Sequence, residues 1–443
     1  MTSGGRARRV SRWITTGSWV LTDQAIVSGG SFLATILLAR SLGPGEFGVY
    51  AWALIGILLI SEVPASIVLS PHSVVGARLE SAEYVIHTST MAALQLVIAV
   101  ASAVVIFLAA LPAELIAPGS GEVFMAAAVG VLGWQFREFV RRVLQTVGRW
   151  RGSFLIAAIG ASVQLIGLMV LLNLDALTAS SALWVLGAAS AVCTVVGALM
   201  TRGAFAPRVS YRSAKEAWVL GRWLLGSQAA AQVGKYVEGI ALPVFAGPAA
   251  YGLYRALTQL IGVFDLPIKA LGNFLRPSFS RLAVGGPVAV DVVVRPLLWS
   301  GCLALVAAAA VAGVFGRQIL QLVYGDEYVV VGHLVFVVAL YPLLTFGRTV
   351  LGSAVIAVDR SPRSLLYSAA AGSAGAIVVG PLSIMLWGVN GAPAAVITGG
   401  TITAAWLWVA WVEKARSGRA AAEAAAERIG MPNELRDTPT GHP

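Results

Sequence analysis

The stretch GPGEFGVY at residues 43–50 recurs as GPAAYGLY at residues 247–254, with the glycine, proline, aromatic, glycine and tyrosine positions matched. The same offset extends upstream in four further pairs: Gly17 with Gly221, Trp19 with Trp223, Gln24 with Gln228 and Gly30 with Gly234. With a slip of one residue, EVP at 62–64 also matches DLP at 265–267. Collinear matches over this length argue against chance recurrence of Gly-Pro turns, so the sequence predicts a duplicated unit.

The composition predicts an integral membrane protein. The chain has 443 residues, of which 58% are hydrophobic and 12% are charged, whereas soluble domains carry about 25% charged residues. A helix needs about 20 apolar residues to cross a bilayer, and about twelve such stretches follow one another. They are Thr16–Ala39, Gly48–Ser70, His87–Leu111, Val123–Val143, Ser153–Leu174, Ser181–Met200, Trp218–Phe245, Tyr251–Leu271, Val293–Val314, Val329–Val350, Leu365–Trp387 and Ala392–Val412.

The distribution of basic residues predicts the orientation. The net charge is +10, but the arginines lie in short loops on one side of the predicted spans, which is typical of cytoplasmic loops. We therefore expect a multi-pass protein of the cell (inner) membrane with both termini cytoplasmic, and no nucleic-acid binding. Cys193 and Cys302 fall inside apolar stretches, so no disulfide or metal site is predicted.

The duplication predicts the architecture. Each unit has an even number of spans, so the two six-helix repeats must be parallel, and such repeats place a substrate site between them. We expect an all-α, two-lobed, V-shaped transporter. Its predicted segments are a basic N-terminus (1–15), an N-lobe (16–205), a C-lobe (206–413) and a cytoplasmic tail (414–443) that begins with an alanine-rich helical extension.

Two matching polar stripes indicate a shared cavity. Gln228, Gln232 and Lys235 lie on one helical face, and Gln24, Ser28 and Ser31 occupy the equivalent positions of the first span. Interhelical hydrogen bonding is the structural alternative. A buried lysine is a costly way to hold helices together, so the cavity is the preferred interpretation.

Ionisable residues inside the spans are the remaining candidates, because burying charge in a bilayer is expensive. Arg255 and Arg348 have no acid at a neighbouring helical position in the sequence and suit an anionic ligand such as a pyrophosphate. Arg255 lies near the predicted outer interface, so snorkelling to the head groups is the alternative for it. The carboxylates Asp23, Glu62 and Glu238 are candidates for binding a coupling proton or Na⁺, and structural roles stay open for them. Pro64 and Pro267 each lie two residues after an acid and are candidate hinges.

The string LLARSLGPGEFGVYAWALIGILL at residues 37–59 resembles the polysaccharide biosynthesis flippases of the multidrug/oligosaccharidyl-lipid/polysaccharide exporter superfamily. The likeness is specific for about the first eighty residues and for the matching stretch from Trp218 to Leu282. It implies twelve helices around a central cavity and transfer of a polyprenyl-diphosphate-linked oligosaccharide between leaflets. Other membrane proteins of glycan assembly are the implied partners, besides membrane lipid.

Two other functions remain open from the sequence. A cation-coupled multidrug exporter of the same superfamily would use acidic and aromatic cavity residues, whereas the second half here is rich in buried cations. A glycan-processing enzyme would need a sizeable outer loop or an acidic cluster, and the predicted outer connections are short. We therefore expect a non-enzymatic transporter with no cofactor other than a coupling ion.

Overall fold

The computed structural model describes residues 3–359 and 363–428. Side chains are described throughout these ranges except at 3–18, 20, 21, 227, 230–233, 235, 265, 266, 269, 270, 273, 277, 359 and 421–428. Every regular element in the described ranges is a helix. This result confirms the predicted all-α class.

The first repeat starts with α1 (Ser3–Pro64), a long helix that bends at Gly43. Gly43 has φ 69° and ψ 170°, a left-handed conformation that favours glycine, so α1 is two helices joined at a kink. After Pro64 the chain continues as a π-helix (Ala65–Leu69), α2 (Ser70–Val75) and a 3₁₀ turn (Gly76–Arg78). The repeat is completed by α3 (Ser81–Ile116), α4 (Ser120–Thr146), α5 (Trp150–Asn173) and α6 (Ala179–Thr201), with a 3₁₀ turn at Arg202–Ala204.

The second repeat follows the same plan. It comprises α7 (Tyr211–Phe245), α8 (Pro248–Ile261), a 3₁₀ turn (Gly262–Phe264), α9 (Asp265–Leu282), a 3₁₀ turn (Ala283–Gly285), α10 (Pro287–Val314), α11 (Gly316–Tyr324), a 3₁₀ segment (Asp326–Leu334), α12 (Val335–Val338), α13 (Tyr341–Asp359), α14 (Arg363–Trp387), a 3₁₀ turn (Gly388–Gly391) and α15 (Pro393–Arg428). α15 runs without a break through the predicted helical extension. The short helix α11 was not predicted, because its apolar positions cover only one face.

Twelve passes across a membrane follow from these helices. In the described part of the chain, nine segments are long and apolar enough to span. The first of them, Thr22–Arg78, contains the kink at Gly43 and so provides two passes. α7 and the broken α8–α9 helix supply the last two. Exposed hydrophobic side chains such as Trp299 and Leu303 of α10 are suited to a lipid environment.

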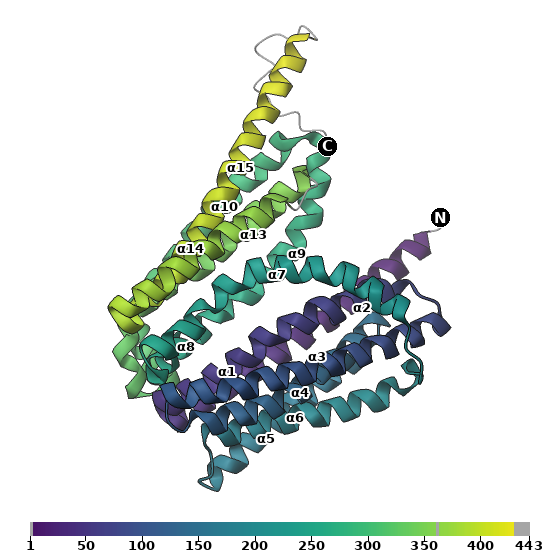
Figure 1. Ribbon diagram of the computed structural model, residues 1–443. Coiled ribbons are helices and arrows are strands. Elements are labelled where there is room, and N and C mark those ends of the chain that lie inside the picture. Colours follow the sequence, from purple (N-terminus) through teal and green to yellow (C-terminus); the bar gives the residue numbers. More distant parts are fainter. Residues whose placement is uncertain (1–2, 360–362, 429–443) are drawn as a thin grey trace.

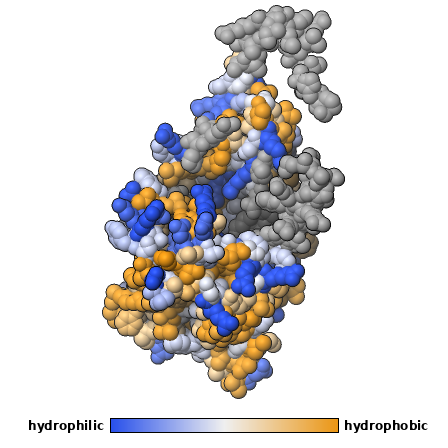
Figure 2. Space-filling view, turned by 90° about the vertical axis from the view of Figure 1, so that its right-hand side faces the viewer, coloured by the Kyte–Doolittle hydropathy of each residue, from blue (hydrophilic) through white to orange (hydrophobic). Residues whose placement is uncertain are grey.

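The helices form two groups that diverge from one end (Figure 1). In the first group, α4 packs against α3 and α6, and α1 packs against α5. In the second group, α14 packs against α15, and α13 against α9 and α15. α7 contacts both groups, since it packs on α14 and also on α1 and α3. Seen from the end where the N-terminus lies, hydrophilic side chains are scattered among hydrophobic ones (Figure 2).

The two groups meet through the duplicated motif itself. Gly247 adopts φ 86° and ψ 160°, close to the conformation of its counterpart Gly43. Behind these turns, α1 and α8 approach so closely that a Cβ on Gly252 would lie 2.9 Å from the backbone nitrogen of Gly48 and would also overlap the carbonyl oxygen of Pro44. A Cβ on Gly48 would likewise overlap the carbonyl oxygen of Pro248. Equivalent glycines of the two repeats therefore contact each other.

Candidate functional site

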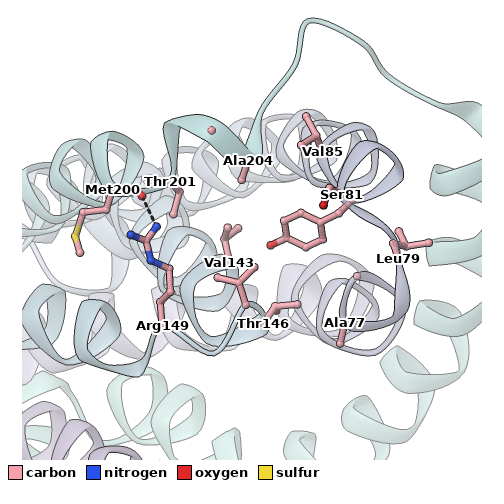
Figure 3. A pocket seen from close by; sticks show the side chains of 14 residues that line it. Ala77, Leu79, Ser81, Val85, Val143, Thr146, Arg149, Met200, Thr201 and Ala204 are labelled. Carbon is pink, nitrogen blue, oxygen red and sulfur yellow. Dashed lines mark hydrogen bonds between the residues drawn. The ribbon is translucent and has the colours of Figure 1, made fainter.

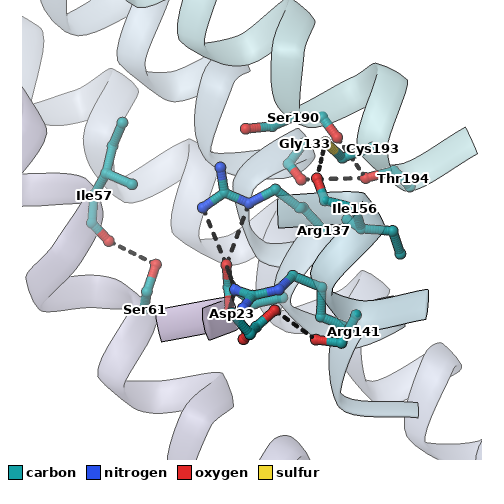
Figure 4. Close-up of polar contacts among 12 residues, drawn as sticks. Asp23, Ile57, Ser61, Gly133, Arg137, Arg141, Ile156, Ser190, Cys193 and Thr194 are labelled. Atoms are coloured by element: carbon teal, nitrogen blue, oxygen red, sulfur yellow. Dashed lines mark hydrogen bonds and ion pairs between the residues drawn. The ribbon is translucent and has the colours of Figure 1, made fainter. Parts of the chain in front are cut away.

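A buried network of charges lies inside the first lobe (Figure 4). Asp23 of α1 is 6% exposed, and its Oδ2 lies 2.7 Å from Nη2 of Arg141 on α4. The Ser153 hydroxyl of α5 donates to Oδ1 of Asp23 at 3.2 Å. Three helices are thus joined at one carboxylate. A coupling ion could bind Asp23 only if this ion pair opened, and the predicted coupling role of Asp23 stays a prediction.

Glu138 extends this network along α4. Its carboxylate accepts hydrogen bonds from Arg137, at 3.0 Å, and from Arg141, at 3.1 Å. The Arg137 guanidinium also lies 4.1 Å from the ring centroid of Trp134, a cation–π geometry. Two arginines therefore share one glutamate within the lobe.

Sequence reasoning did not identify Arg137, Glu138 and Arg141 as site residues. They lie near the end of the predicted fourth span, where basic residues were interpreted as orienting charges. In the structure α4 continues to Thr146, so these residues lie one to two turns inside the helix. The i, i+3 spacing of Glu138 and Arg141 was the available signal.

A second polar centre lies where the two lobes meet. Glu238 of α7 is 8% exposed and accepts a hydrogen bond of 3.0 Å from the hydroxyl of Tyr254 on α8. The Tyr254 hydroxyl is also 2.7 Å from that of Tyr341 on α13. Tyr236 of α7 donates to Glu62 of α1 at 3.5 Å. Both predicted acids, Glu62 and Glu238, therefore lie among tyrosine hydroxyls contributed by other helices.

Arg255 of α8 directly follows Tyr254 of this centre in the sequence, and it is half-buried. No carboxylate of the described residues lies within 4.0 Å of its guanidinium. Arg255 therefore has no ion-pair partner among the described side chains.

The predicted polar stripes are described only in part. Gln24 donates to Ser28 within α1 at 3.3 Å, and both Gln24 and Ser31 are exposed. On the equivalent helix Gln228 is exposed, whereas the side chains of Gln232 and Lys235 lie outside the described part of the chain. Arg348 is exposed on α13. A cavity shared by the two polar stripes therefore stays a prediction.

Both predicted hinges lie beside a departure from α-helical geometry. Pro64 is the last residue of α1, and the π-helix Ala65–Leu69 begins directly after it. Pro267 is the third residue of α9, which follows the 3₁₀ turn Gly262–Phe264. The side chain of Asp265, the acid that precedes Pro267, lies outside the described part of the chain. No residues among those described gather as a metal-binding group of three.

These helices and their parallel repeats give the chain the fold of a class of membrane transporters. A lipid II flippase, MurJ, in an inward closed conformation superposes with a TM-score of 0.70 at 10% identity, over 95% of this chain and 94% of that one. An inward-facing multidrug resistance transporter of the MATE family, from the MOP superfamily, superposes with a TM-score of 0.64 at 15% identity, over 91% of this chain and 95% of that one. A MOP superfamily transporter from Pyrococcus furiosus, described as having a binding pocket of reverse polarity, superposes with a TM-score of 0.58 at 14% identity, over 90% of this chain and 95% of that one. No family model and no curated protein matches the chain.

Proposed function

We propose that this protein is a transporter that moves a polyprenyl-diphosphate-linked oligosaccharide from the cytoplasmic to the outer leaflet by alternating access. Its fold supports the transporter class, since the similar solved structures are named as a flippase and as multidrug transporters. In the proposed orientation both termini face the cytoplasm, and the joint between the two lobes lies toward the outer leaflet.

Arg255 is the observation that favours an anionic substrate. A half-buried guanidinium is expensive to desolvate unless an anion pairs with it. The described residues supply no carboxylate to Arg255, whereas a diphosphate would accept its fork of donors in a bidentate manner.

The first lobe adds further positive charge near the other end of the path. Arg142 of α4 is partly buried, and it has no ion pair among the described side chains. It follows Arg141 and Arg137, whose charges are balanced by Asp23 and Glu138. One net positive charge therefore remains in this part of α4.

A leaflet-resolved assay of the lipid-linked oligosaccharide tests the proposal. We expect cells lacking the protein to accumulate it on the cytoplasmic leaflet, and the wild-type gene to relieve the accumulation. Arg255→Ala is expected to lower the flipping rate about tenfold or more, since a charge-assisted contact contributes roughly 1.5–3 kcal/mol. In the deletion strain, the Arg255→Lys variant should give part of the wild-type flipping rate. Arg317 is an exposed arginine outside the spans, so the Arg317→Ala variant is the control and should give the full wild-type rate. Normal glycan export in the deletion strain would overturn the proposal.

A cation-coupled multidrug exporter is the second candidate function. The buried Glu238 with Tyr254 and Tyr341, and Glu62 with Tyr236, form an acidic and aromatic centre that would suit a cationic drug. The same strains decide between the two candidates. Loss of resistance to lipophilic cations in the deletion strain, with leaflet distribution of the glycan lipid unchanged, would favour drug export.

A further inference from the structure

A pocket of about 520 Å³ opens at the end of the first lobe (Figure 3). Three turns between spans enclose it: Gly76–Leu79 before α3, Thr146–Arg149 between α4 and α5, and Met200–Ala204 after α6. Its volume lies within the range of roughly 300–1,000 Å³ that is typical of small-molecule sites. In the proposed orientation, these turns lie at the level of the cytoplasmic lipid head groups.

The pocket combines an apolar wall with a basic rim. Val85, Val143, Val147 and Met200 supply apolar surface. The rim carries Arg149, which lines the pocket and donates a hydrogen bond of 3.1 Å to the carbonyl oxygen of Met200 across the pocket edge. The other two turns carry the exposed Arg78 and Arg202, which do not line the pocket. Glu80 and Glu83 are the nearby acids at the start of α3, and both are exposed.

Polar atoms without a hydrogen-bond partner lie at and behind the pocket wall. Tyr84 lines the pocket, and its hydroxyl has no partner among the described residues. Behind it, His72 and His87 are fully buried with their rings stacked at 5.5 Å, and their four ring nitrogens are likewise unpartnered within the described part of the chain. Burying such groups without partners is unfavourable.

We propose that this pocket binds the head group of an anionic phospholipid, separately from the transported substrate. The phosphate would lie beside Arg149 and accept hydrogen bonds from Arg149 and Ser81. The glycerol and the start of the acyl chains would contact the valines and Met200. Basic pockets between spanning helices at the cytoplasmic surface have the chemistry that binds such lipids.

The apolar wall distinguishes a lipid from a free anion. A free phosphate would use only the rim, which is exposed to water and salt and therefore holds an anion weakly. A phospholipid would also bury apolar surface on the wall, and the bilayer would hold it at high local concentration. The lipid is therefore expected to bind where inorganic phosphate does not.

Photo-crosslinking of the full-length protein tests the site. The purified chain would be placed in vesicles of phosphatidylcholine with a photoactivatable phosphatidylglycerol, and crosslinked peptides would be mapped. Crosslinks are expected within residues 76–85 and 146–149. Arg149→Gln should weaken labelling about fivefold, the effect of one arginine at an anionic surface. Arg276→Gln, an exposed arginine of α9, is the matched control and should label as the wild type does.

A second variant places a negative charge in the pocket. Ser81→Glu places a carboxylate on the pocket rim in the first turn of α3, where acidic residues are well tolerated, and it should abolish the crosslinks. Ser280→Glu at an exposed position of α9 controls for the added charge. In parallel, phosphatidylglycerol should raise the melting temperature of the wild type in detergent, and inorganic phosphate should not. Equal labelling of Ser81→Glu and wild type, or equal protection by free phosphate, would overturn the proposal.

Discussion

Replacing Gly48 by alanine is expected to open the contact between α1 and α8. A Cβ at residue 48 would overlap the carbonyl oxygen of Pro248 and lie 3.2 Å from the backbone nitrogen of Gly252. Backbone atoms cannot move aside by changing rotamer, so the two helices must separate. Overpacking of this kind costs about 3 kcal/mol at the upper end of its usual range.

The net effect on the equilibrium between closed and open molecules is smaller, because the neighbouring turn can relax. Gly→Ala stabilises a helix by about 1 kcal/mol whether the lobes are together or apart, so this gain helps the fold but does not restore the contact. Allowing about 1 kcal/mol for relaxation of the neighbouring turn, about 2 kcal/mol acts against the closed contact. That difference lowers the ratio of closed to open molecules about thirtyfold.

Distances between spin labels would measure this shift. Labels at Glu46→Cys and Ala249→Cys, two exposed positions on the joined helices, would report the separation after Cys193 and Cys302 are replaced by alanine. The wild type should give one short distance, and Gly48→Ala should add a longer one. Gly56→Ala is the matched control, since nothing lies within 4 Å of its Cβ position. An unchanged distance distribution and melting temperature for Gly48→Ala would refute the reasoning.

Two further predictions concern buried carboxylates. Asp23→Ala should destabilise the protein by about 3 kcal/mol in denaturant unfolding, because it leaves Arg141 buried with only part of its charge balanced. The double variant that adds Arg141→Met should recover much of this loss, and equal instability of both variants would contradict the account. Asp291 of α10 accepts hydrogen bonds from Trp411 at 3.0 Å and from Arg419 at 2.6 Å, both on α15. Asp291→Asn should therefore speed hydrogen exchange in α15 near these two residues, because it lowers the free energy of local opening by about 1–2 kcal/mol. Unchanged exchange there would show that this contact does not hold α15 to α10.

The sequence predicted the fold well because each spanning helix is specified locally. About 20 apolar residues with polar turns on either side leave little choice of structure in a bilayer. The recurring Gly-Pro motif then predicted that the two halves are parallel six-helix repeats. Helix α11 could not be found in this way, since its apolar residues cover one face and its length is only nine residues.

The polar partners were much harder to predict than the helices. Asp23 and Arg141 are 118 residues apart in the chain, and nothing in either local pattern indicates the other. Glu238 accepts a hydrogen bond from Tyr254 on another helix, and no local pattern around Glu238 indicates that contact. Such contacts depend on how the helices pack, which periodicity does not report. Arg255 was identified because its lack of a nearby acid is a local property.

The contact between Gly48 and Gly252 also bears on how such a chain can arise. Each copy of the motif docks against the other copy, so the surface of one six-helix unit is complementary to itself, as in a twofold-symmetric dimer. Two identical units would have to carry the same residue at each symmetric position. Joined in one chain they can differ, and the positions equivalent to Glu238 and Arg255 are Ala34 and Ala51. Fusion therefore allows an acid and an arginine to be placed on one side only of an otherwise symmetric joint.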